Sequence, residues 1–134
     1  MDSVSDDNWF YDGSNNEVSC RPIVTVNLTR HRITKEQEYF FVVNPPRCDA
    51  SRVRKLLSFD VVPSEKEMNE RAAILANIAV ATAFSESSNK TIYAWIDADA
   101  FFLGNIAQAL LDIGIIPVYA FYKNGKFVKF IRKS

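Results

Sequence analysis

Three short runs of the chain have the hydrophobic and β-branched composition of β-strands. Ile23–Leu28 is β-branched and follows a proline, Thr91–Ile96 is apolar at nearly every position, and residues 116–122 form the third run. A strand that is apolar on both sides is typical of a parallel sheet covered by helices. We therefore predict three strands here, with Thr91–Ile96 in the interior of the sheet.

A helical period begins after Pro63. Ser64 and Glu67 have the spacing of a capping box. The apolar residues that follow recur at intervals of three and four, and they are Met68, Ala72, Leu75, Ala76, Ala79 and Ala83. One face of this helix is predicted to pack closely on the sheet and the other to face water, with a polar loop over residues 85–90.

Thr34 and Gln37 have the spacing of a second capping box, so a short helix is predicted to begin there. Residues 39–43 fit either the continuation of that helix or a strand. Their aromatic and β-branched side chains favour the strand.

Two further helices and a hairpin complete the prediction. Asp49 can cap a helix that runs through Leu57, and residues 101–113 form a helix that Gly114 ends. Asn124-Gly125 is typical of a two-residue hairpin turn, which would pair residues 116–122 with residues 127–131.

Strands separated by helices indicate an α/β fold. We expect a small Rossmann-like three-layer sandwich, with a mainly parallel sheet and an antiparallel hairpin at its C-terminal edge. Residues 22–134 are predicted to form this single domain. Residues 1–21 lack a hydrophobic period and are predicted to form an acidic flexible arm.

Charge is unevenly distributed, although the whole chain of 134 residues carries 16 basic and 16 acidic residues. Five of the acids, and no base, lie in the first 20 residues: Asp2, Asp6, Asp7, Asp12 and Glu17. The predicted domain is therefore mildly basic, with clusters around Arg47–Lys55 and Lys123–Lys133. Such clusters favour anionic partners, but the surplus is too small for a protein that coats DNA.

Several classes of protein are not expected. Cys20 and Cys48 with the one histidine cannot make an ordinary four-ligand zinc site, and we expect free thiols in a reducing compartment. Neither a membrane span nor a signal peptide is apparent, so a cytoplasmic protein is predicted. Motifs of nucleoside triphosphatases, dinucleotide-binding enzymes, α/β-hydrolases and zinc proteases are absent from the sequence.

Candidate chemistry follows two of the predicted strands. Asn27, Thr29, Arg30 and His31 lie at the end of the first strand, and Asp97 and Asp99 come directly after Thr91–Ile96. Ligands bind at the carboxyl ends of parallel strands, so these side chains are expected to share a cleft if the strands are neighbours. The first group suits phosphate oxygens, because guanidinium, hydroxyl and imidazole groups can all bind them.

Each group has a second interpretation. His31 is a candidate general acid or base, or it orients its own loop. Asp97 and Asp99 have a spacing that can direct two carboxylates to one Mg²⁺, or one of them caps the helix that follows.

Three blocks of the sequence resemble a family of small bacterial proteins. They are VNLTRHRITKEQ (residues 26–37), LLSFDVVPS (residues 56–64) and ALLDIGIIPVYAF (residues 109–121). The family pattern runs N-L-T-x-H-x-x-T-x-E-Q, L-L-x-F-x-x-x-P and G-I-x-P-x-Y-A-F. The resemblance implies a Rossmann-like domain similar in architecture to CRISPR-associated Rossmann domains and ring nucleases, which bind or cleave cyclic oligonucleotides.

The chain departs from the family pattern at two places. Asp97-Ala98-Asp99-Ala100 stands where the family has G-G-A-P, so either a metal bridges these acids to an anion or the ligand here is cationic. Tyr122 stands where the family has serine, and it either stacks on a base or packs beside Phe101.

We therefore expect binding of a phosphate-containing nucleotide, with a cyclic oligonucleotide second messenger as the leading candidate, in bacterial or phage defence. His31 would assist phosphodiester cleavage. The ligand contacts are expected from Asn27, Thr29, Arg30, Asp97, Asp99, Phe101 and Tyr122. The alternatives are a non-enzymatic protein-interaction module of a mobile element and a Mg²⁺-dependent nuclease with Asp97 and Asp99 as metal ligands, so the cofactor is either Mg²⁺ or none.

Two kinds of protein contact are also expected. Trp9, Phe10 and Tyr11 are three consecutive aromatic residues, which either fold back onto the domain or meet a protein partner. A homodimer is the second expectation, because a two-fold axis can build one site for a symmetric ligand.

Overall fold

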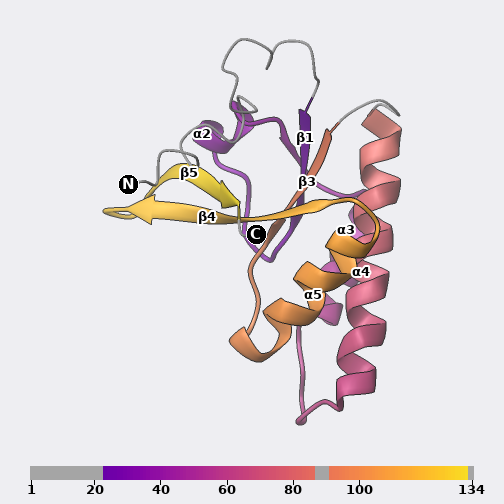
Figure 1. Ribbon diagram of the computed structural model, residues 1–134. Coiled ribbons are helices and arrows are strands. Elements are labelled where there is room, and N and C mark those ends of the chain that lie inside the picture. The colour runs from indigo at the N-terminus through magenta and orange to yellow at the C-terminus, as the bar shows by residue number, and fades with distance from the viewer. Residues whose placement is uncertain (1–22, 87–90, 133–134) are drawn as a thin grey trace.

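The computed structural model describes residues 23–86 and 91–132. Their sheet has five strands in the order β2-β1-β3-β4-β5 (Figure 1). The first four strands are parallel, and β5 runs antiparallel to β4. The fold is thus mixed α/β, with the mainly parallel sheet and the C-terminal antiparallel pair that the sequence predicts. The predicted arm with Trp9, Phe10 and Tyr11 lies outside the described residues.

The centre of the sheet is formed by β1 (Ile23–Leu28) and β3 (Thr91–Ile96), which have the predicted bounds, and β3 has the predicted interior position. They pair over their whole length, from Ile23 beside Thr91 to Leu28 beside Ile96. Their carboxyl ends therefore lie side by side. β4 (Ile116–Lys123) pairs with the other edge of β3.

The strand predicted over residues 39–43 is much shorter in the structure. β2 consists of Val42–Val43 alone. Tyr39 is the C-cap of α2 (Lys35–Glu38), and Phe41 has a φ of 60°, which an extended strand cannot contain. The segment therefore turns sharply before it enters the sheet.

The predicted capping boxes position two of the helices. Thr34 Oγ1 accepts from the Gln37 amide at the start of α2, and Ser64 Oγ accepts from the Glu67 amide at the start of α4 (Glu65–Glu86). α5 spans Ala100–Asp112 and ends before Gly114, whose φ of 83° fits the predicted stop.

The predicted cap at Asp49 is wrong. α3 (Arg47–Leu56) begins earlier, with Pro46 instead of Asp49 at the N-cap and no capping side chain. The carbonyl of Pro46 accepts from the Ala50 amide at 2.8 Å, so it takes part in the first turn of the helix. Asp49 lies in the first helical turn, where its carboxylate is 3.8 Å from Arg52.

Two hydrophobic clusters lie on opposite faces of the sheet. The larger joins Val24, Val26 and Leu28 of β1 to residues of α3, α4 and α5, so these helices cover the same face. The smaller contains Tyr93, Trp95 and Val118 and is closed by Phe127 and Phe130 of β5 (Lys126–Arg132). In the described residues, the second face carries only the short α2 as a helix, so a three-layer sandwich is not confirmed.

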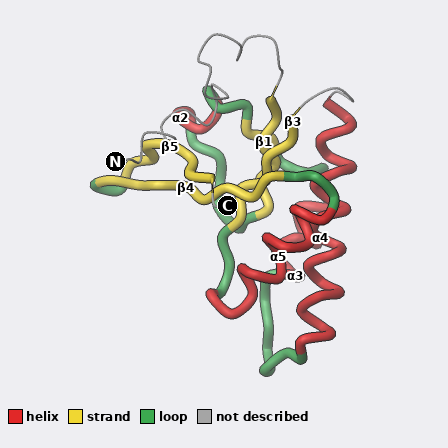
Figure 2. The backbone as a smooth tube through the Cα atoms, viewed as in Figure 1, coloured by secondary structure: helices red, strands yellow, loops and turns green. Residues whose placement is uncertain are grey.

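The β4–β5 hairpin projects away from the helical layer (Figures 1 and 2). Asn124 and Gly125 form its turn with φ values of 54° and 78°, as their sequence predicts. Of the helices described, even the long α4 lacks the apolar stretch needed to cross a bilayer.

Candidate functional site

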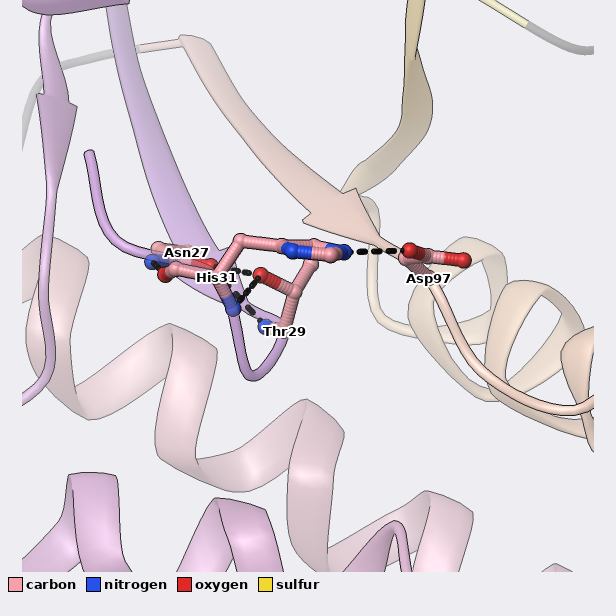
Figure 3. Close-up of polar contacts among 4 residues, drawn as sticks. All are labelled: Asn27, Thr29, His31 and Asp97. Atoms are coloured by element: carbon pink, nitrogen blue, oxygen red, sulfur yellow. Dashed lines mark hydrogen bonds and ion pairs between the residues drawn. The ribbon is translucent and has the colours of Figure 1, made fainter. Parts of the chain in front are cut away.

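The ends of β1 and β3 bring a histidine and a carboxylate together. His31 lies in the loop after β1, and Asp97 directly follows β3. His31 Nε2 lies 2.6 Å from Asp97 Oδ2, although 66 positions separate them in the chain (Figure 3). Of the two acids expected to share a cleft with His31, this contact involves Asp97 alone. Both side chains are about half exposed, at 52% and 57%, so the pair is accessible to a ligand.

Asn27 and Thr29 hold the loop that carries His31. Asn27 Oδ1 accepts from the Thr29 amide at 2.9 Å and from its hydroxyl at 2.7 Å, and Thr29 Oγ1 accepts from the His31 amide at 2.9 Å. Asn27 Nδ2 donates to the His31 carbonyl at 2.8 Å and to Asn44 Oδ1 at 3.0 Å. Because these buried groups already have partners, their contribution is to fix the position of the imidazole.

The indole ring of Trp95 stacks on the imidazole of His31. Its ring centroid lies 5.7 Å from that of His31, with 14° between the two planes, and Trp95 itself is 1% exposed. The tryptophan points to the same face of the sheet as Asn27 because the two residues are directly paired across β1 and β3. His31 is therefore fixed by its backbone, by a stacked ring and by Asp97.

Tyr122 of β4 lies in the electrostatic environment of this pair. Burial raises the pKa of the Tyr122 hydroxyl, the neighbouring Gln37 amide lowers it, and the negative charge of Asp97 raises it, with a net upward shift. Gln37 is fully buried, and its Nε2 has no hydrogen-bond partner among the described residues. Tyr122 therefore lies near enough to Gln37 and Asp97 for both to influence the pKa of its hydroxyl.

A cleft of about 720 Å³ opens beside His31, at the carboxyl ends of β1 and β2 and the start of α3. We call it the arginine cleft because Arg30, Arg32, Arg47 and Arg54 line it. Glu38 is the one acid among its described lining residues. The cleft is therefore strongly cationic.

Three of the four guanidinium groups have neither a counter-ion nor a hydrogen-bond partner within the described part of the chain. Ion pairs of arginine there involve Arg52 and Arg71, whereas Arg32, Arg47 and Arg54 have none. Arg30 instead donates to the Leu57 carbonyl at 2.6 Å and to Ser58 Oγ at 3.2 Å, which ties the loop after β1 to the end of α3. The N-terminus of α3 adds backbone amides without a side-chain cap. This combination is suited to an anion.

Asp99 and Phe101 lie in a different hollow. They line a cavity of about 480 Å³ together with Phe59 and Val62, and Asp99 occupies the N-cap position of α5 without a capping hydrogen bond from its side chain. Within residues 23–86 and 91–132, no three metal-ligating side chains gather at one point. Asp97 and Asp99 therefore have different surroundings, with Asp97 engaged by His31.

Sequence reasoning missed several residues of this site. Arg47 and Arg54 belong to a basic cluster that was visible in the sequence, but only the position of α3 shows that they face the end of β1. Trp95 was assigned to the core, and its alternation with Ile96 gave a signal that it shares a face with Asn27. Arg32 follows the first strand, where its guanidinium was expected to suit an anion together with that of Arg30, and it does line the cleft, whereas Asn44 gave no signal.

Comparisons with protein-family models, with curated proteins and with solved structures found no match to this chain. The function must therefore be inferred from the site itself.

Proposed function

We propose that the protein binds a phosphate-containing nucleotide, with its phosphate in the arginine cleft and its ribose near His31 and Asp97. The observation that carries this proposal is the set of three guanidinium groups without counter-ions, on Arg32, Arg47 and Arg54, in a cleft beside the imidazole. Charge-assisted hydrogen bonds from arginine to phosphate are among the strongest polar contacts in proteins. A cyclic oligonucleotide is the leading ligand because it presents several phosphates and ribose hydroxyls together.

The His31–Asp97 pair suggests that the bound phosphodiester is cleaved. Asp97 accepts a hydrogen bond from Nε2–H, which leaves Nδ1 of a neutral imidazole free to accept a proton. In the proposed reaction, Nδ1 takes the proton of a ribose 2′-hydroxyl while its oxygen bonds to the adjacent phosphorus. The bond from phosphorus to the 5′-oxygen breaks, and that oxygen receives the proton. The products are a 2′,3′-cyclic phosphate and a 5′-hydroxyl.

The strand order supports this location. β1 lies between β2 and β3, and the chain leaves β1 first toward one side and later returns to the other. Ligands in open α/β sheets bind at such a reversal, outside the carboxyl ends of the strands. We propose on this basis that the domain is a Rossmann-like variant whose second face lacks a full helical layer in the described residues.

Thermal unfolding in the presence of cyclic di-, tri-, tetra- and hexanucleotides tests the binding. A ligand at a concentration of about 100 times its Kd stabilises the folded state by about 2.7 kcal/mol. Arg47→Ala combined with Arg54→Ala should remove this stabilisation. Arg52→Ala is the matched control, because Arg52 lies on the same helix but does not line the cleft.

The cleavage step is tested separately with the ligand that binds best. Cleavage should persist in EDTA, yield a 2′,3′-cyclic phosphate and fail with a 2′-deoxy analogue. Cleavage that requires Mg²⁺ and is lost in Asp97→Asn with Asp99→Asn would instead support a metal-dependent nuclease. If no nucleotide alters the unfolding temperature, the binding proposal is wrong.

A further inference from the structure

The β4–β5 hairpin has two chemically different faces. The inward face places Phe127 and Phe130, which are 8% and 0% exposed, against Phe40 and Trp95. On the outward face, Phe121 stands opposite Lys129 and Lys123 stands opposite Lys126. Successive strand residues point to opposite faces, so Phe121 and Lys123 share this outward face.

The outward face carries positive charge and an exposed aromatic ring. β4 and β5 contain no Asp or Glu, and Phe121 is 44% exposed. Lys123 and Lys126 face each other across the ladder. In the described part of the chain, neither of them forms an ion pair that would offset their mutual repulsion. Like charges directly opposite on neighbouring strands oppose pairing. An anionic partner would relieve this repulsion.

The hairpin also contains an irregularity next to this face. The register shifts between Phe121 and Tyr122, so Val128 is an additional residue in β5. Val128 is 46% exposed. A bulge of this kind bends and twists a strand, and it often redirects side chains toward a binding surface.

We propose that this outward hairpin face, defined by Phe121, Lys123 and Lys126, binds single-stranded nucleic acid. The phenyl ring provides a stacking surface for an unpaired base, and the lysines contact the neighbouring phosphates. A duplex is a poorer ligand because its bases are already stacked. This surface is separate from the arginine cleft and requires neither the cleft nor His31.

The test is fluorescence anisotropy of the full chain with labelled oligothymidylate and oligouridylate about 12 nucleotides long, within the usual site size for such surfaces. Phe121→Ala should weaken binding about tenfold, and Phe121→Tyr should retain it. Lys123→Gln with Lys126→Gln should weaken binding and reduce the slope of log affinity against log salt by about 1.4. Lys55→Gln with Lys66→Gln is the charge-matched control on the helical layer, and it should change neither the affinity nor the salt dependence.

Three results would overturn the proposal. The first is equal affinity for a duplex of the same length or for polyglutamate, which would indicate a general polyanion or acidic protein partner. The second is loss of oligonucleotide binding in the Arg47→Ala, Arg54→Ala variant with retention in the hairpin variants, which would assign the strand to the arginine cleft. The third is a loss of affinity in the Lys55→Gln, Lys66→Gln control equal to that in the Lys123→Gln, Lys126→Gln variant. Thermal unfolding of each variant establishes that it is folded.

Discussion

His31 Nε2 and Asp97 Oδ2 lie 2.6 Å apart at the ends of two neighbouring parallel strands. A carboxylate can only accept in this contact, so the neutral imidazole carries its proton on Nε2. The free Nδ1 is then the atom able to accept a proton from a ligand. The tautomer of this one side chain is therefore central to the proposed cleavage.

The tautomer can be measured directly, because His31 is the one histidine of the chain. Long-range ¹H–¹⁵N correlation at neutral to alkaline pH should show Nε2 protonated and Nδ1 unprotonated. Asp97→Ala should give a mixture of both tautomers, whereas Asp99→Ala should not change the spectrum of His31. A dominant Nδ1–H form in the unmodified protein would show that the Asp97 contact does not persist in solution.

The same pair predicts the response of activity to substitution. Removing general acid–base assistance slows a reaction by about 100- to 10,000-fold. Asp97→Asn should therefore lower kcat for phosphodiester cleavage by about 100-fold, with a smaller change in KM. Asp99→Asn is the matched control and should retain most activity, since Asp99 lies in the hollow with Phe101.

Trp95 connects the core to the site. It is 1% exposed and packs on both His31 and Phe130. Trp95→Ala should lower the free energy of unfolding by about 3–5 kcal/mol, as is typical when a large buried aromatic is truncated. Phe101→Ala should lower the free energy of unfolding by clearly less, because Phe101 is 55% exposed. Urea unfolding distinguishes these outcomes, and similar losses for the two variants would contradict the packing described.

Local chemistry explains which parts of this structure could be predicted from the sequence. The Thr34–Gln37 capping box and the Asn124-Gly125 turn are determined by neighbouring residues, and both form as predicted. The start of α3 was missed because Asp49 has the side chain of a cap, whereas Pro46, the observed N-cap, offers no capping side chain. The strand over residues 39–43 was overestimated because its composition gives no indication of the positive φ at Phe41.

The site was predictable to a similar extent. Parallel strands end at a common edge, so the two strand assignments predicted the meeting of His31 with Asp97 on the condition that the strands are neighbours, which the pairing of β1 with β3 fulfils. Asp99 was grouped with Asp97 because they are two residues apart. However, α5 begins immediately after Asp99, and the two carboxylates have different surroundings. The arginine cleft depends on where α3 packs, which no local pattern specifies.

Replacing each of two glycines with alanine should change the stability of the protein in opposite directions. Gly104 lies inside α5, and an added methyl group would meet nothing within 4 Å, so Gly104→Ala should stabilise the protein by about 0.5–1 kcal/mol. Gly125 has a φ of 78° in the hairpin turn, so Gly125→Ala should destabilise it by about 1 kcal/mol. Chemical denaturation of both variants measures the difference. A stabilising Gly125→Ala would show that the turn differs from the one described.

Ionisation of Tyr122 makes the free energy of unfolding depend on pH in the alkaline range. Burial is the main cause that raises the pKa of its hydroxyl above the ordinary value of 10.0, and the charge of Asp97 adds to it. The folded state therefore holds the phenolic proton more tightly than the unfolded state. This contribution to stability is fully present below pH 10.0 and is lost as the pH rises through the folded-state pKa.

Tyr122→Phe should accordingly reduce the loss of stability between about pH 9 and pH 11, measured by urea unfolding against the unmodified protein. Asp97→Asn should have a smaller effect in the same direction, because it removes the electrostatic cause and leaves burial unchanged. If neither variant alters the alkaline slope, Tyr122 is not held close to Asp97 in solution. That result would also remove the phenol from the candidate site, while the His31–Asp97 contact would still be judged by the tautomer of the imidazole.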